Sequence, residues 1–382
     1  MNKSPSRVIL AYLNTGGGHR STARAVAEAL HDLYGGCIHA QLVDVTAEYF
    51  SWPLSELSAV YQALVQFHGW PWALTYHLTN GQRRLSLLRK PWWLITRSAI
   101  RTFLEHHPAD VVVCCHPLLK APCAKALRIK SQEKALITLV TDLASGHASW
   151  FVAGDDRCLV ATERTQERAV TCGLPRSRVE VTGLPVKPCF VDAAQRDSGP
   201  TRQKLGLDPD GSVILLLSGA DGVGPLFHLV KTIADSGVKA ELAVITGRND
   251  ALRRDIASRS WSLPVHAKGF VDNVHEWMLA ADLLVTKAGP STISEALVMG
   301  LPMVLSGALP GQERPNVDYV VENGAGVWAP TPREVATAVC RLLNTETPLL
   351  AQMSQRAQSL ARPGAAQRVA RIIWESTQEE LA

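Results

Sequence analysis

The sequence predicts an α/β protein with two doubly wound domains, each a parallel sheet covered by helices. Aliphatic runs of strand length alternate with segments of helical periodicity, and the alternation occurs in two blocks. The strand-like runs lack polar alternation, which is typical of a parallel sheet buried on both faces. The length of 382 residues exceeds one ordinary doubly wound domain and suits two.

The first block contains five strand-like runs, and a helix is expected directly after the first run. Ser21 or Thr22 is the expected cap of this helix, because hydroxyl side chains favour that position. The runs are at 8–13, 111–115, 136–141, 158–161 and 179–182. The second block has further runs at 213–217, 242–246, 283–286 and 303–305.

Prolines and glycines interrupt the pattern between the blocks, which indicates an interdomain linker. We therefore expect an N-terminal domain at 1–187, a linker at 188–203 and a C-terminal domain at 204–362. A final helix is expected at 363–382. Packing of this helix back against the N-terminal domain is one arrangement that we consider.

Composition excludes several classes of protein. Hydrophobic residues make up 46% and charged residues 19%, which is a globular composition. No signal peptide is visible and no run reaches the ~20 apolar residues that span a bilayer. The eight cysteines form no CxxC pair and read as buried thiols. Asp208-Pro209-Asp210 resembles a metal-binding DxD but reads as a turn, so no metal is expected.

A glycine-rich segment, Gly16-Gly17-Gly18-His19, lies between the first strand and the first helix. Glycines let the backbone approach a ligand closely, and a helix start offers free N–H groups. The spacing differs from the dinucleotide fingerprint GxGxxG. A plain tight turn is the alternative, but an imidazole at the carboxyl end of a strand faces the region where ligands bind.

Two segments of the second block have the character of a nucleotide site. Ser218-Gly219 begins a glycine-containing turn after a strand, and Gly289-Pro290-Ser291-Thr292 opens a helix after another. Helix N-terminal amides and hydroxyls suit a diphosphate. Glu295, one turn on, suits ribose hydroxyls, and a capping box with Thr292 is the alternative. Gln312, Glu313 and Asn316 follow in a polar loop suited to sugar hydroxyls, which alone reads equally as a surface loop.

The window from Phe50 to Phe103 holds five of the ten tryptophans and no acidic residue between Glu56 and Glu105. Tryptophan favours the headgroup region of a membrane, and basic side chains pair with anionic lipid. A helical insertion with core tryptophans is the alternative, and no nucleic-acid motif is present. The candidate acceptor and membrane residues are Gly17, Gly18, Trp70, Trp72, Arg83, Arg84, Trp92, Trp93 and His116.

These segments together resemble the monogalactosyldiacylglycerol synthase group of GT-B glycosyltransferases, which stands beside the MurG-type enzymes. The resemblance covers most of the chain, from about Leu10 to Trp328. It is carried by Thr15-Gly16-Gly17-Gly18-His19-Arg20, Cys115-His116-Pro117-Leu118, Thr141-Asp142-Leu143, Gly269-Phe270-Val271, Thr286-Lys287-Ala288-Gly289-Pro290, Glu295-Ala296-Leu297 and Pro310-Gly311-Gln312-Glu313. Gly146-His147-Ala148-Ser149 departs from the Cys-His-Pro that usually precedes Trp-Phe in the group.

The resemblance implies a GT-B fold, with two Rossmann-like domains facing across a cleft. It implies inverting, metal-independent transfer from a UDP-sugar to diacylglycerol or another lipid. Phe270 and Val271 would flank the uracil and Glu295 would hold the ribose. The diphosphate would lie on Ser218, Gly219, Gly289, Ser291 and Thr292, and the sugar on Gln312 and Glu313.

His19 is the expected general base, since its ordinary pKa of ~6.5 suits proton removal, and Asp142 either orients it or is the base itself. No cofactor is expected beyond the UDP-sugar, and no nucleic-acid partner. We expect a cytoplasmic protein, peripheral on the inner face of the cell membrane and attracted to anionic lipid. The alternatives are a transferase of the same fold with a polyprenyl lipid or a soluble acceptor, a UDP-sugar epimerase, and a non-catalytic lipid- or nucleotide-binding module.

Overall fold

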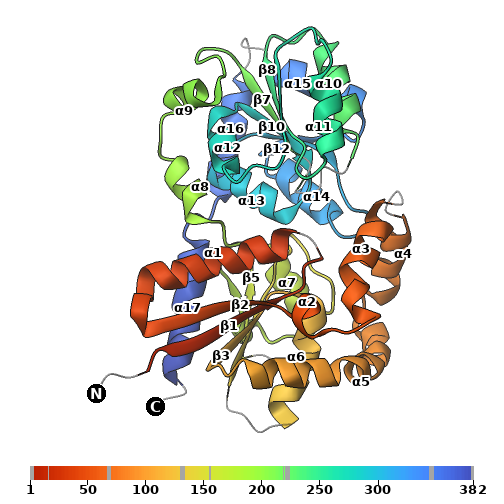
Figure 1. The fold of residues 1–382 in the computed structure, drawn as a ribbon, viewed down its shortest axis with the longest axis vertical. Helices are drawn as coiled ribbons and strands as arrows, with labels where there is room; N and C mark the ends of the chain where they lie inside the picture. Colours follow the sequence, from red (N-terminus) through yellow and green to blue (C-terminus); the bar gives the residue numbers. More distant parts are fainter. Residues whose placement is uncertain are drawn as a thin grey trace. The chain divides into compact units, whose positions relative to one another are not determined.

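The computed structural model describes residues 4–15, 17–66, 70–129, 134–154, 156–217, 219, 224–343 and 348–379. The chain divides into two compact units (Figure 1). The first unit comprises Met1–Pro188, Pro310–Gln312 and Pro363–Ala382. The second unit comprises Cys189–Leu309 and Glu313–Arg362.

The first unit is built on a parallel six-stranded sheet with the order β2-β1-β3-β4-β5-β6. Its strands are β1 (Ser6–Tyr12), β2 (Ile38–Asp44), β3 (Val111–Cys114), β4 (Ala135–Leu139), β5 (Arg157–Val160) and β6 (Val179–Val181). Its helices are α1 (Gly17–Tyr34), α2 (Val45–Tyr49), α3 (Leu57–Gln66), α4 (Trp70–Thr79), α5 (Gln82–His106), α6 (Pro117–Ile129), α7 (Glu163–Thr171) and α17 (Ala365–Glu379).

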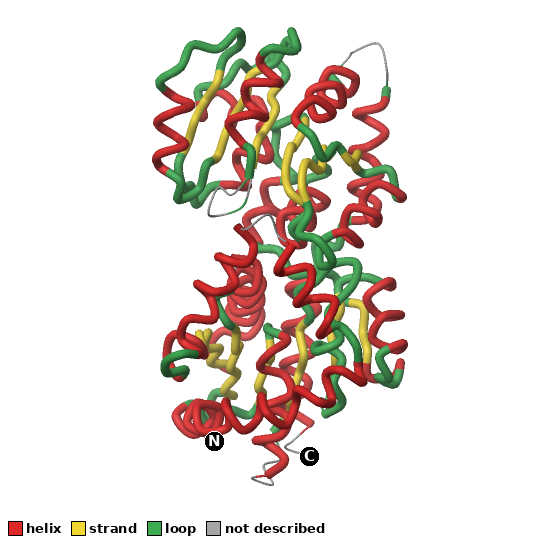
Figure 2. The backbone as a smooth tube through the Cα atoms, turned by 90° about the vertical axis from the view of Figure 1, so that its right-hand side faces the viewer, coloured by secondary structure: helices red, strands yellow, loops and turns green. Residues whose placement is uncertain are grey.

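The second unit is built on a parallel six-stranded sheet with the order β12-β11-β10-β7-β8-β9. Its strands are β7 (Val213–Leu217), β8 (Glu241–Ile245), β9 (Val265–Lys268), β10 (Leu283–Lys287), β11 (Met303–Gly307) and β12 (Gly326–Trp328). Its helices are α9 (Ser198–Leu205), α10 (Leu226–Ala234), α11 (Asp250–Ala257), α12 (Val274–Ala280), α13 (Pro290–Val298), α14 (Arg314–Glu322), α15 (Pro332–Leu342) and α16 (Leu349–Leu360). Figure 2 shows strands and helices in both units.

The predicted fold class is confirmed, because both sheets are parallel and doubly wound. Every strand-like run of the sequence forms a strand. Three strands were not predicted: β2, β9 and β12, which are all edge strands. Their residues alternate between buried and exposed or are only partly buried, so they lack the continuous aliphatic character of central strands.

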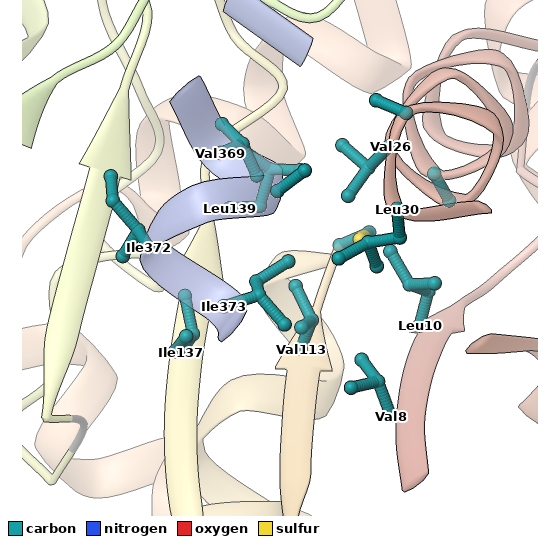
Figure 3. Close-up of a cluster of buried hydrophobic side chains, with 14 of the residues drawn as sticks. Val8, Leu10, Val26, Leu30, Val113, Ile137, Leu139, Val369, Ile372 and Ile373 are labelled. Carbon is teal, nitrogen blue, oxygen red and sulfur yellow. The ribbon is translucent and has the colours of Figure 1, made fainter. Parts of the chain in front are cut away.

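Helices α1 and α17 pack together on one face of the first sheet. Val26 and Leu30 of α1 meet Val369 and Ile373 of α17 over the buried strand residue Val113 (Figure 3). Each such side chain stabilises the fold by about 1.5–3 kcal/mol through removal from water. The last helix is therefore part of the core of the first unit.

The segment 188–203 is largely helical. Helix α8 (Pro188–Ala193) begins it, and α9 includes its end. Arg202 is buried and makes two 2.9 Å hydrogen bonds to the carboxylate of Asp282 in the second unit. This pairing fixes α9 to the start of β10.

The predicted cap of α1 is wrong. The helix begins at Gly17, so Ser21 and Thr22 lie inside it, and Thr22 is buried. The helix starts four residues before Ser21, and His19 in its first turn donates a hydrogen bond to the carbonyl of Cys115, directly after β3. Gly17, Gly18 and His19 thus belong to the helix N-terminus.

Candidate active site

Both sets of motif residues lie where the strand order reverses. In an open parallel sheet, ligands bind at the carboxyl edge beside this reversal. The reversal lies between β1 and β3 in the first sheet and between β7 and β10 in the second. The glycine-rich segment with His19 follows β1, and His116 follows β3. Gly219 follows β7, and Gly289 follows β10.

His19 is held in one tautomer. Its Nδ1 lies 2.9 Å from the carbonyl oxygen of Cys115 and 2.8 Å from Oγ1 of Thr141. A carbonyl oxygen only accepts, so Nδ1 carries the proton and Nε2 carries the lone pair. Among the described residues, none forms a hydrogen bond with Nε2. The geometry therefore presents Nε2 as a proton acceptor.

A second imidazole supports the first. Nδ1 of His116 accepts the N–H of Leu118 at 3.3 Å, so its protonated Nε2 donates to Oγ1 of Thr15 at 3.0 Å. The rings of His19 and His116 meet edge to face with centroids 4.5 Å apart. Both ring nitrogens of His116 are therefore engaged in hydrogen bonds, one with Thr15 and one with Leu118.

Both imidazoles are neutral at physiological pH. Burial lowers the pKa of His19 to about 4, although its bond to the Cys115 carbonyl acts in the opposite direction. Burial, and then the neighbouring His19, lower the pKa of His116 well below its ordinary value. His19 therefore keeps its lone pair near neutral pH and can accept a proton.

Asp142 follows β4 and contacts a tryptophan. Its Oδ2 accepts the indole N–H of Trp150 at 2.8 Å, and the buried Trp150 ring lies 6.2 Å from the ring of His19. The hydrogen bonds of His19 itself go to Cys115 and Thr141. Sequence reasoning missed Thr141 as the orienting residue, although its place before Asp142 at a strand end was the available signal.

The loop of Asp142 is tied to the junction of α4 and α5. Nε2 of His147 lies 3.1 Å from Oγ1 of Thr79, and Oδ1 of Asn80 accepts the N–H of Ala148 at 2.9 Å. Gln82 donates to the carbonyl of Phe151 at 3.0 Å. Burial, together with Arg168, lowers the pKa of His147 to about 4. A polar network therefore links the tryptophan-rich helices to the site.

The tryptophans of the predicted membrane region differ in exposure. Trp70 is 65% exposed, Trp72 and Trp92 are half-buried, and Arg83 and Arg84 are exposed. Trp93 is 7% exposed and belongs to the core with Phe103, so its assignment to a membrane contact is wrong. Helix α5 is amphipathic, and Trp93 lies on its inward face. We call the exposed residues of this region the membrane patch. It comprises Trp70, Arg83 and Arg84 together with the exposed apolar residues Trp52, Val60, Leu74, Leu78, Leu87, Leu88, Leu94 and Ile95.

In the second unit, the turn after β10 leads directly into α13. Gly289 is the N-cap residue and Pro290 is the first helical residue, while Ser291 and Thr292 are half-buried in the first turn. The first N–H groups of a helix have no intrahelical partner, which suits an anion. Gly219 has a φ of +68°, which favours glycine at the turn after β7. Ser218 lies outside the described residues.

The polar loop residues have specific contacts. Glu313 is 3% exposed, and its carboxylate binds Nζ of Lys287 at 2.6 Å and the N–H of Leu309 at 2.8 Å. The buried Asn316 donates to the carbonyl of Ala288 at 3.0 Å. Both contacts position the turn after β10. Gln312 is half-buried, and its Oε1 has no hydrogen-bond partner among the described residues.

The residues predicted for the nucleoside lie on the same unit. Phe270 is 64% exposed, with the guanidinium of Arg248 5.8 Å from its ring centre. Val271 and Glu295 are half-buried. An exposed aromatic ring beside a strand end is suited to stacking on a base.

No helix in the described part of the chain is both long and apolar enough to cross a membrane. Two parallel doubly wound units with polar groups at both reversals define the class of GT-B proteins. Solved structures share this fold: MurG of Acinetobacter baumannii has a TM-score of 0.61 at 16% identity, covering 97% of this chain and 100% of that one. A putative UDP-N-acetylglucosamine 2-epimerase of Listeria monocytogenes has a TM-score of 0.64 at 15% identity, covering 96% and 95%.

Sequence comparison gives the family. Residues 19–186 match the monogalactosyldiacylglycerol synthase family, and residues 213–369 match the C-terminal domain of glycosyltransferase family 28. A probable chloroplastic monogalactosyldiacylglycerol synthase of Glycine max is 34% identical, covering 98% of this chain and 72% of that protein. Monogalactosyldiacylglycerol synthase 1 of Arabidopsis thaliana is 34% identical, covering 94% and 69%. The chain belongs to the monogalactosyldiacylglycerol synthase family, which confirms the resemblance.

Proposed function

We propose that this protein is an inverting, metal-independent glycosyltransferase that moves a hexose from a UDP-sugar to diacylglycerol. The observation that carries the proposal is the family membership, since relatives matching nearly the whole chain are named monogalactosyldiacylglycerol synthases. The tautomer of His19 supports the same chemistry, because a neutral imidazole with a free lone pair is a general base.

In this mechanism the acceptor hydroxyl gives its proton to Nε2 of His19 as its oxygen attacks the anomeric carbon. The new glycosidic bond forms while the bond from that carbon to the diphosphate oxygen breaks, and UDP leaves with the electron pair. A single displacement inverts the anomeric configuration. Thr141 and the Cys115 carbonyl hold the imidazole in the tautomer that this step requires.

The donor is assigned to the second unit. The uracil ring stacks on Phe270 beside Val271, and Glu295 binds the ribose hydroxyls. The diphosphate lies on the first turn of α13. Backbone amides with the hydroxyls of Ser291 and Thr292 then stabilise the leaving charge without a metal ion or cofactor.

The acceptor is assigned to the first unit and reached from a membrane surface. Exposed Trp70 lies on α4, and exposed Arg83 and Arg84 begin α5, which suits contact with anionic lipid. We place the protein peripherally on the cytoplasmic face of the cell membrane, with no nucleic-acid partner. Gly17, Gly18 and His116 line the acceptor side in this proposal.

The test is an incubation of the purified protein with diacylglycerol vesicles and a panel of UDP-sugars, without divalent cations and with chelator. Lipid products are identified by mass and the anomeric configuration by NMR. The proposal expects a monohexosyl lipid of inverted configuration. A product formed solely after magnesium is added, a retained configuration, or isomerised UDP-sugar in the absence of lipid would contradict it.

A further inference from the structure

We infer that Lys287 supplies the fixed positive charge that binds the diphosphate of the donor, and that buried Glu313 positions its ammonium group. The inference rests on the proposed UDP-sugar donor and adds to it a residue that binds the leaving group. It assigns to Glu313 a positioning role in place of contact with the sugar.

The location of Lys287 is the first observation. It is the last residue of β10, at the reversal of the second sheet. Its side chain passes between two glycines: a methyl group at Gly219 would lie 3.7 Å from Cε, and one at Gly289 would lie 3.2 Å from Nζ. The ammonium therefore lies beside the N-cap of α13 and near the turn after β7, which are the two segments assigned to the diphosphate.

The anchoring of the ammonium is the second observation. Oε1 of Glu313 binds Nζ at 2.6 Å, and Oε2 of the same carboxylate is fixed by the N–H of Leu309. A lysine side chain loses much rotamer freedom when held, so a fixed partner prepares it before the ligand arrives. An ammonium group has three protons to donate, and Glu313 takes one. With the Lys287 side chain 39% exposed, a ligand can reach the ammonium.

A purely structural ion pair explains this arrangement less well. An ion pair with a buried member contributes little stability after desolvation, and apolar residues often replace one without loss. A helix N-terminus supplies only about half a positive charge, which is too little to neutralise the negative charge of a diphosphate. The ammonium of Lys287 adds positive charge at the place where negative charge develops on the leaving diphosphate. The same unit holds an exposed pair of equal length, Lys204 with Glu276, whose lysine is 65% exposed.

The test compares two ligands that differ by one phosphate. We measure UDP and UMP affinities by calorimetry, in chelator, for the wild type, Lys287→Met, Lys287→Arg and the matched control Lys204→Met. Lys287→Met is expected to lower UDP affinity by about 10- to 100-fold and UMP affinity much less, so that the ratio between them collapses. Lys287→Arg keeps the charge and should retain most of the ratio, and Lys204→Met should retain all of it.

A UDP-to-UMP ratio in Lys287→Met equal to that of the wild type would overturn the inference, even if both affinities fell together. If Lys287→Met does not fold, a ratio reduced in Lys287→Gln decides for the inference and an unchanged one against it. A wild type that binds no UDP would instead remove the proposed function itself, so the two failures are distinguishable.

Discussion

The two strand reversals of this protein share a topology and differ in charge. The reversal of the first sheet holds two imidazoles whose pKa values burial lowers, so both rings are uncharged near neutral pH. The reversal of the second sheet holds an ammonium, a carboxylate and the positive end of a helix. The difference indicates that the first reversal suits proton removal from a neutral hydroxyl, while the second suits an anion.

The largest expected effect comes from removing the His19 imidazole at the reversal of the first sheet. His19→Ala should lower kcat by about 100-fold or more, the usual contribution of a general base, and leave UDP affinity unchanged. His31→Ala is the matched control, because His31 is exposed on the same helix. Steady-state kinetics and calorimetry measure the two quantities. Near-normal turnover of His19→Ala would remove His19 from the mechanism.

The next largest effect comes from removing the Glu295 carboxylate in the second unit. Glu295→Ala should weaken UDP binding by about 10- to 100-fold, because a carboxylate would lose its hydrogen bonds to ribose hydroxyls. Glu322→Ala, an exposed carboxylate at the end of α14, is the control. If calorimetry gives Glu295→Ala the UDP affinity of the wild type, the ribose assignment is wrong.

A smaller effect separates exposed from buried tryptophans. Trp70→Ala should lower affinity for anionic vesicles by about 5- to 10-fold with little change in Tm, since an exposed side chain contributes to binding and not to the core. Trp93→Ala should cost about 3–5 kcal/mol of stability through the cavity it leaves. Vesicle sedimentation and thermal unfolding separate these outcomes. Equal vesicle binding by Trp70→Ala and the wild type would argue against the membrane patch.

The smallest expected effect is the pH response of the base. With the pKa of His19 at about 4, kcat/KM should show less than a twofold acid loss from His19 between pH 8 and 6, and an acid limb near pH 4. A limb near 6.5 would show an imidazole with an ordinary pKa and contradict the neutral site.

The same shift has a consequence for stability. The folded state binds fewer protons at His19 and His147 than the unfolded chain does between pH 6.5 and 4. The free energy of unfolding should therefore fall as the pH is lowered through this range. Urea unfolding at pH 7 and pH 5 measures it, and His147→Gln should show a shallower loss than the wild type.

Much of the candidate site follows from local sequence. Glycine turns after aliphatic strands predicted the two loops, and His19 stood out because it follows one of them. Trp93 shows the limit: a tryptophan in a basic window reads the same whether it faces water or the core, because helical phase over a long helix decides exposure. Strands β2, β9 and β12 at sheet edges were missed for a related reason, since partial burial removes the aliphatic pattern.

The sequence by itself determined the fold class, the family and the identity of the polar groups, since periodicity and turn residues act over short distances. Only the tertiary structure decided the tautomer of His19, because Cys115 and Thr141 lie 96 and 122 residues away along the chain. It also decided that the carboxylate of Glu313 holds Lys287, across 26 residues. Hydrogen bonds between strand ends depend on the order of strands in a sheet, and strand order is a property of the folded chain.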